Sequence, residues 1–182
     1  MPADDSVEDH VKDTLVAGAG LRHEDTVRFV VEHGHAAIEW LVQEGVPFSH
    51  DEMHPEELHL TREGGHSKRR VVHAADATGA AIQETLQKKV LSHPNITVLE
   101  NHIAVDLITA GKLGLAEQRC LGVYALDTRS NQVKTFAAPA TILATGGAGK
   151  VYLYTTNPDV ATGDGVAMAW RAGCRIANME FI

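Results

Sequence analysis

The sequence predicts an α/β fold, with helices in its first half and mainly strands in its second half. Before Pro94, apolar residues recur at helical spacing in three segments. After Pro94 the pattern changes to short runs rich in Val, Ile and Leu, which are typical of strands. One more helical segment follows near the end of the chain, so helices and sheets are expected to pack in layers.

Three helices are predicted in the first half, because each apolar stripe begins after a polar or glycine-containing stretch and stops at Gly or Pro. Ser6 and Asp9 form a capping box, with Asp9 in place of the usual Glu or Gln. The predicted helices are Ser6–Gly18, Glu24–Glu44 and Ala74–Ser92. Residues 48–72, which lie between the last two, show little periodicity and indicate loop with short strands.

Strands are predicted over residues 96–100, 103–108, 119–128 and 132–147. Arg129, Ser130 and Asn131 separate the last two as a hairpin turn. The run "TILATGG" is apolar and ends in small residues, as a buried strand that enters a tight turn would. A glycine-started helix over residues 163–173 and a strand-like run over residues 174–182 complete the pattern.

The composition indicates one globular domain and excludes several classes of function. The 182 residues are 44% hydrophobic and 22% charged, which argues against global disorder. A net charge of -8 disfavours nucleic acid as the main partner. The polar N-terminus and the lack of a run of roughly 20 apolar residues predict no signal peptide and no membrane partner, hence a cytoplasmic location.

No metal site or disulfide is expected. Cys120 and Cys174 are far apart and stand in no ligand spacing. His66 and His73 are seven positions apart in a donor-rich loop, and no cysteine or carboxylate cluster completes a ligand set with them.

Three segments combine the residues from which binding chemistry can be built. "HLTREGGHSKRRVVHAADATG" (59–79) concentrates donors around one carboxylate, so it is either a solvated loop or a pocket for a small anion. "LATGG" (143–147) is either a tight turn or a place where backbone approaches a ligand. "TGDG" (162–165) precedes a helix, and it either presents free N–H groups to an anion or caps the helix through Asp164.

Together with "ATILATGGAGKVYLYTTNP" and "TGDGVAMAWRAGCRIANMEF", the first segment resembles the L-aspartate oxidase family. These FAD-dependent oxidoreductases are related to the flavoprotein subunits of succinate dehydrogenase and fumarate reductase. The resemblance implies oxidation of L-aspartate to iminoaspartate, the first step of NAD synthesis through quinolinate. It also implies oxygen or fumarate as the electron acceptor, and it suggests quinolinate synthase as a partner.

The resemblance further implies an FAD/NAD(P)-binding, Rossmann-like α/β domain that lacks its first βα unit and carries an added antiparallel β hairpin. Residues 1–182 would be a partial FAD-binding domain, without the N-terminal dinucleotide fingerprint and the C-terminal capping domain. The family's catalytic arginine would fall after Ile182, so no catalytic residue is expected within the chain. A truncated, non-catalytic module is the alternative.

Residue by residue, the resemblance assigns substrate binding to Glu63, which would pair with the α-ammonium of aspartate, and to Thr61. The alternative for Glu63 is an exposed loop glutamate. A flavoprotein of the succinate or fumarate type would carry an apolar residue at this position, so Glu63 argues against that class. The residues expected on the cofactor side are Ala104, Val105, Thr145, Gly146 and Asp164.

Two properties of the isolated chain are expected from what it lacks. FAD should bind weakly or not at all, because the glycine turn and helix that hold the pyrophosphate are missing. The chain should also self-associate, because an unpaired position in a parallel sheet is open to another chain.

Overall fold

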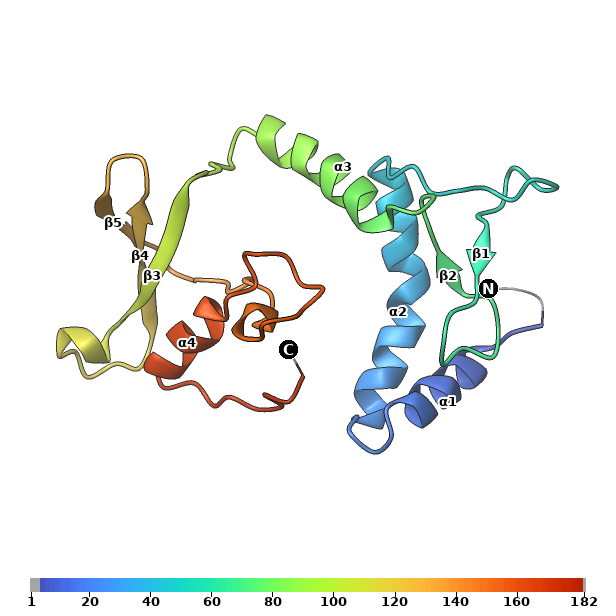
Figure 1. Cartoon of the computed structure of the whole chain (residues 1–182), viewed down its shortest axis with the longest axis horizontal. Coiled ribbons are helices and arrows are strands. Elements are labelled where there is room, and N and C mark those ends of the chain that lie inside the picture. The colour runs from blue at the N-terminus through green and yellow to red at the C-terminus, as the bar shows by residue number, and fades with distance from the viewer. Residues whose placement is uncertain (1–3, 182) are drawn as a thin grey trace. The chain divides into compact units, whose positions relative to one another are not determined.

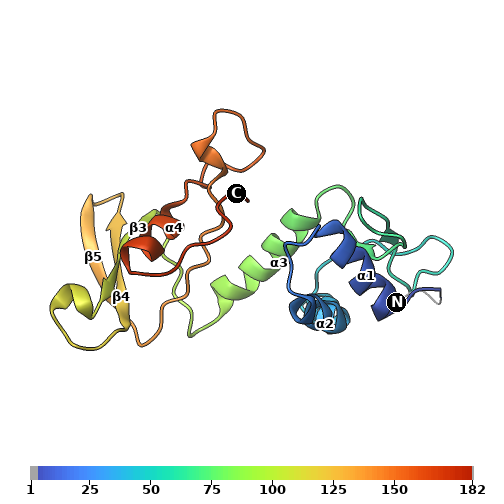
Figure 2. The same cartoon turned by 90° about the horizontal axis from the view of Figure 1, so that it is seen from below.

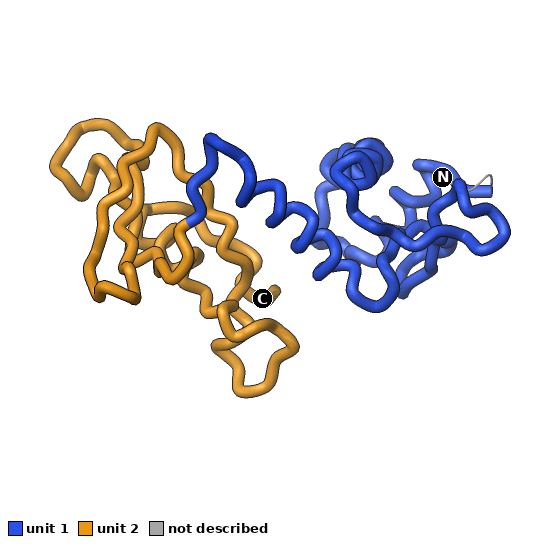
Figure 3. The backbone as a smooth tube through the Cα atoms, turned by 90° about the horizontal axis from the view of Figure 1, so that it is seen from above, with its two compact units in different colours: residues 1–98 blue, residues 99–182 orange. Residues whose placement is uncertain are grey.

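The computed structural model describes residues 4–181 and divides the chain into two compact units (Figure 3). Unit 1 covers residues 1–98 and unit 2 covers residues 99–182. Figure 1 shows that unit 1 is mainly helical and that unit 2 contains the larger sheet. None of the helices in residues 4–181 combines the length and the apolar character needed to cross a membrane.

Unit 1 contains three helices and a small two-stranded sheet. The Oγ atom of Ser6 accepts a hydrogen bond from the Asp9 amide at 3.1 Å, so the predicted capping box starts the first helix. This helix packs against the second. The helices are α1 (Val7–Ala17), α2 (Glu24–Gln43) and α3 (Thr78–Ser92), and the antiparallel strands are β1 (Leu60–Thr61) and β2 (Val71–Val72).

The first two helices have nearly the predicted bounds, but α3 begins four residues later than predicted. Ala75 has a φ of 43°, which is not helical, and the Ala74 amide donates to Thr78 Oγ1 at 3.1 Å. A turn therefore precedes the helix. The apolar core of unit 1 is small, because α2 and α3, which are described throughout, bury no residue. Its buried apolar residues are Val11, Val46, Phe48 and Ala74.

Unit 2 is built on an antiparallel sheet in the order β3-β4-β5, against which a short helix packs (Figure 2). The predicted hairpin turn is confirmed: Asp127 Oδ1 accepts from the amides of Arg129 and Ser130, at 3.0 and 3.4 Å. The elements are β3 (His102–Thr109), η1 (Gly111–Leu113), β4 (Cys120–Asp127), β5 (Gln132–Ala137), η2 (Gly149–Val151) and α4 (Asp164–Arg171).

Three predicted strands are wrong in whole or in part. Residues 96–100 and 174–181 form no strand, and β5 ends at Ala137 instead of continuing to residue 147. "TILATGG" forms no strand within the described residues and is not buried, since Ile142 is 89% exposed and Gly146 has a φ of 68°. Apolar, β-branched residues favour the extended backbone, but a strand also needs a neighbour for its N–H and C=O groups.

Candidate functional site

A pocket in unit 2 brings together three of the five residues predicted to bind the cofactor. Ala104 comes from β3, Thr145 from the segment that follows β5, and Asp164 from the first turn of α4. The pocket has a volume of about 170 Å³. Val105 and Gly146 are sequence neighbours of lining residues but do not line it themselves. The other lining residues are Ile103, Val160, Thr162, Gly165 and Met168.

Glycines allow α4 to start against this pocket wall. Gly163 precedes the helix with a φ of 79°, a left-handed conformation that suits glycine. A Cβ atom added to Gly165 would lie 1.7 Å from Thr145 Oγ1, so only glycine permits the observed approach. The two glycines of "TGDG" therefore bring the helix and Thr145 together.

Asp164 does not cap α4, in contrast to one of the two interpretations of "TGDG". It is the first helical residue, and the cap position is held by Gly163, which offers no side chain. The Asp164 carboxylate instead accepts a hydrogen bond from Thr162 Oγ1 at 2.6 Å. Two of the residues that line the pocket, Thr162 and Asp164, are thus hydrogen-bonded to each other.

The β3 wall of the pocket is irregular. Ala104 pairs with Ala125 and Asp106 pairs with Tyr124, so Val105 has no paired residue on β4 within the described sheet. An extra residue of this kind is a β-bulge, which redirects the strand. Val105 is 45% exposed, and its carbonyl accepts a hydrogen bond from Arg171 Nη2 at 3.0 Å.

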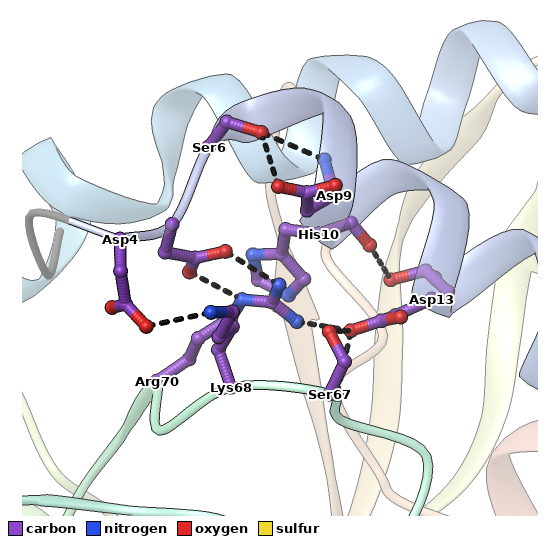
Figure 4. Close-up of polar contacts among 10 residues, drawn as sticks. Asp4, Ser6, Asp9, His10, Asp13, Ser67, Lys68 and Arg70 are labelled. Carbon is purple, nitrogen blue, oxygen red and sulfur yellow. Dashed lines mark hydrogen bonds and ion pairs between the residues drawn. The ribbon is translucent and has the colours of Figure 1, made fainter.

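In unit 1, most donors of the predicted anion-binding stretch are used inside the unit (Figure 4). Arg70 donates two hydrogen bonds to Asp5, from Nε at 2.6 Å and from Nη2 at 2.7 Å. Its third hydrogen bond, from Nη1, reaches Asp13 at 2.6 Å. Lys68 pairs with Asp4 at 2.6 Å, and the amide and hydroxyl of Ser67 both donate to Asp13 at 2.7 Å. This N-terminal aspartate cluster (Asp4, Asp5, Asp13 with Ser67, Lys68, Arg70) fastens the loop to α1.

The electrostatics of this cluster follow from these contacts. Hydrogen bonds from Ser67 hold the pKa of Asp13 well below its usual range, and the hydrogen bond from Arg70 lowers the pKa of Asp5. The same contacts raise the pKa of Arg70 further. Burial lowers the pKa of His10, with Arg70 and His66 acting in the same direction. The contacts within the cluster therefore stabilise the ionised forms of Asp5 and Asp13.

The two residues predicted to bind substrate lie at the β1 end of this loop. Glu63 is exposed, and its carbonyl accepts from the His66 amide at 3.2 Å. Thr61 is half-buried and donates from Oγ1 to the Val71 carbonyl at 3.3 Å. Thr61 lines an open pocket of about 970 Å³, whereas Glu63 does not. The other lining residues are Asp4, Asp51, Glu57, Leu58, His59, Leu60, Arg62, Ser67, Lys68 and Arg69.

Some lining residues of the unit 2 pocket were missed by the sequence interpretation. Met168 follows Asp164 by four positions, which places both on one face of α4, and this helical spacing was the available signal. Ile103 and Val160 gave no comparable signal. Across residues 4–181, no group of three His, Cys, Asp or Glu side chains is arranged to hold a metal ion.

Comparison with known proteins shows the family to which the chain belongs. Residues 1–182 match the family model of the FAD binding domain, so the chain belongs to the flavoproteins that carry this domain. It is 63% identical to L-aspartate oxidase 1 of Ralstonia nicotianae, over 100% of this chain and 34% of the relative. It is 60% identical to L-aspartate oxidase of Pseudomonas aeruginosa, over 97% of this chain and 34% of the relative. The chain therefore spans about a third of the length of these curated relatives.

Solved structures support the same fold. A mutant FrdA chain of Escherichia coli quinol fumarate reductase matches with a TM-score of 0.85 and 31% identity, over 94% of this chain and 28% of that one. Mycobacterium smegmatis Sdh1 matches with a TM-score of 0.82 and 27% identity, over 93% and 29%. The sequence resemblance to L-aspartate oxidases is confirmed, and FAD is the cofactor that the family match indicates.

The chemistry of the unit 2 pocket fits part of FAD. Ile103, Val160 and Met168 offer apolar contact, while Thr145 and Asp164 offer a hydroxyl and a carboxylate. A carboxylate accepts hydrogen bonds from hydroxyl or amino groups and repels phosphate. The pocket therefore suits a sugar or base portion of the dinucleotide better than its pyrophosphate.

Proposed function

We propose that the chain is part of an FAD-dependent L-aspartate oxidase that converts L-aspartate to iminoaspartate. The observation that supports this most is the 63% identity to such an enzyme across all of this chain. Oxygen or fumarate is the proposed electron acceptor. Quinolinate synthase as a partner, and a cytoplasmic location, rest on the resemblance and the sequence alone; an Arabidopsis relative, 51% identical, is chloroplastic by name.

In the proposed reaction, bound FAD supplies the redox chemistry by accepting a hydride from the substrate carbon. The Asp164 carboxylate and the Thr145 hydroxyl would hold FAD by hydrogen bonds, and the backbone at Ala104, Val105 and Gly146 would approach it closely. Glu63 would pair with the α-ammonium of aspartate and so orient the substrate. No catalytic acid or base is assigned within residues 1–182.

Glu63 is exposed, as the alternative of an exposed loop glutamate also expects, so its proposed role rests on the resemblance; no hydrogen bond or ion pair among the described residues occupies its side chain. A carboxylate without an internal partner is free to take a cation. The succinate or fumarate type is the alternative, favoured by the match to fumarate reductase at 31% identity. The two classes differ in whether the substrate carries an ammonium group.

The test replaces Glu63 by Gln in a chain extended to full length with the flanking segments of the Ralstonia nicotianae relative. Glu63→Gln keeps the shape but removes the charge, so aspartate oxidation should fall by roughly one to three decades. Fumarate reduction, which involves no ammonium, should change much less. The exposed Glu52 provides the matched control, since Glu52→Gln should leave both activities unchanged. Equal loss on both substrates after Glu63→Gln would remove the substrate assignment.

Self-association of the chain is a separate proposal. The segment at residues 139–147 belongs to no strand among the described residues, and it carries Ile142 at 89% exposure. Unpaired backbone with exposed apolar side chains favours pairing with a second copy. Sedimentation of the 182-residue chain should show a dimer or larger species, and a monomer at high concentration would contradict the proposal.

A further inference from the structure

Polar contacts join the last residue of α4 to β3 at its bulge. Arg171 donates from Nη2 to the Val105 carbonyl at 3.0 Å and from Nε to Asp106 Oδ1 at 3.2 Å. Lys112 donates to Asp106 Oδ2 at 2.6 Å and to the Leu107 carbonyl at 3.2 Å. We call Arg171, Asp106 and Lys112 the Arg171 clamp.

The clamp joins two elements that both contribute residues to the unit 2 pocket. Asp164, at the start of α4, and Ala104, next to the bulge, both line the pocket. Arg171 ends the same helix, and Val105 and Asp106 follow Ala104 on the same strand. Met168 lies on α4 between the two ends and is 1% exposed. Buried packing and the clamp together fix the helix on the strand.

A guanidinium group is suited to this position. At the bulge Val105 has no Cα partner on β4, and its carbonyl accepts a hydrogen bond from Arg171. Arg presents several N–H donors in one plane and reaches this carbonyl and the Asp106 carboxylate together. A Lys ammonium is a single charged point and holds both acceptors less well.

We propose that Arg171 is a positioning residue for FAD: it fixes the Ala104–Val105 backbone relative to Asp164. This inference rests on the proposed function, in which that backbone approaches FAD. We place the adenosine half of FAD here, because the pocket of about 170 Å³ suits a sugar or base portion and its carboxylate repels phosphate. Arg171 touches no reacting atom in this role. It keeps β3 and α4, which both line the pocket, in a fixed position relative to each other. Its loss should therefore weaken cofactor binding more than it lowers the stability of the fold.

The test measures the affinity for FAD by flavin fluorescence. It uses the same protein as the Glu63 test, in which the chain is extended to full length with the flanking segments of the relative. The Arg171 side chain is 45% exposed, so solvent screens its contacts, and Arg171→Gln should raise the dissociation constant by about three- to fivefold. Arg171→Lys should lie between this variant and the wild type. Arg175→Gln is the matched control: Arg175 is exposed, makes no ion pair among the described residues, and loses the same charge.

Competition with fragments of FAD separates positioning from general damage. ADP carries the adenosine half, so its affinity should fall with Arg171→Gln, while FMN, which lacks adenosine, should bind as before. Equal losses for ADP and FMN, or equal FAD affinities in the Arg171 and Arg175 variants, would overturn the positioning role.

Hydrogen exchange in the unextended chain tests the clamp without cofactor. The Leu107 amide donates to Asp106 Oδ1 at 3.0 Å, and Arg171 and Lys112 both hold the Asp106 carboxylate, so Arg171→Gln should speed exchange of this amide by about threefold. Unchanged exchange would overturn the clamp. If the wild-type extended protein binds no FAD, the proposed function fails. If it binds FAD and Arg171→Gln binds equally well, only the clamp's role fails.

Discussion

The donor-rich loop of unit 1 (residues 59–73) and the glycine turn of unit 2 (residues 162–165) differ in how they use their residues. In the loop, Arg70 and its neighbours satisfy aspartates of the same unit. In the turn, Gly163 and Gly165 contribute no side chain, and a pocket forms where they let α4 meet Thr145. In this protein the dense hydrogen-bond donors of the loop are paired within unit 1. The glycines of the turn, which have no side chains, instead leave room for a ligand.

The largest expected effect comes from filling the glycine turn. Gly165→Ala would place a Cβ atom 1.7 Å from Thr145 Oγ1, so the helix and Thr145 must separate. We expect unit 2 to lose about 3 kcal/mol of unfolding free energy, as for overpacking of a tight contact. Urea unfolding would be followed in a variant whose only tryptophan is Trp170, on α4; Trp40, on α2, serves the same purpose for unit 1.

The matched control is Gly79→Ala in α3. Nothing lies within 4 Å of the Cβ atom it would add, and alanine favours a helix over glycine. This variant should be neutral or slightly more stable. A second change, Thr145→Ala, should recover part of the loss caused by Gly165→Ala. Equal stability of the Gly165 and Gly79 variants would show that the close approach does not constrain unit 2.

A smaller effect is expected from breaking the aspartate cluster. The Arg70 side chain is 4% exposed and the Asp5 side chain 0%, so Arg70→Met leaves a covered carboxylate without its partner. Both residues as a whole are half-buried, and we therefore expect about 2 kcal/mol of destabilisation, less than for a fully enclosed pair. Urea unfolding of the variant with only Trp40 would measure it.

The neighbouring Arg69 provides the control for this change. It is exposed and forms no ion pair among the described residues, so Arg69→Met removes the same charge without breaking a contact. Its unfolding midpoint should stay close to that of the parent. If both arginine variants lost the same stability, net charge rather than the Arg70 contacts would stabilise unit 1.

Local features were predictable from the sequence, and features that depend on distant partners were not. Ser6 and Asp9 identify the start of α1 because capping joins residues three apart. "TILATGG" was predicted as a buried strand, but pairing depends on a neighbour that the segment itself does not specify. The Arg70–Asp5 pair joins residues 65 positions apart, so the donor-rich loop could not be told from an anion site.

The candidate site was predictable to the same degree. The resemblance supplied Ala104, Thr145 and Asp164, and the structure places them around one pocket. The glycines of "TGDG" indicated a close approach, but the sequence did not say to which residue. The bulge at Val105 also escaped prediction, because the register of two antiparallel strands is set by their pairing rather than by either strand alone.

The smallest expected effect is a difference between the units in acid. In unit 1 the pKa values of Asp4, Asp5 and Asp13 are lowered by hydrogen bonds from Lys68, Arg70 and Ser67 respectively. In unit 2 the pKa values of Asp106 and Asp127 are lowered by Lys112 and Lys134. A lowered pKa means that the folded state holds fewer protons than the unfolded state, so stability falls as the pH falls through this range.

Because burial also lowers the pKa of His10 from its ordinary value of 6.5, unit 1 should begin to lose stability just below that pH. Both units should lose more as the pH falls through and below 3.8, the ordinary value of their aspartates. The loss should stay below that of Arg70→Met, since Arg70 remains in place and solvent screens the exposed pairs. Urea midpoints of the two single-tryptophan variants, measured between about pH 7 and about pH 3, would test this order. His10→Phe should abolish the early loss in unit 1, and an earlier loss in unit 2 than in unit 1 would contradict the assignment of the early loss to His10.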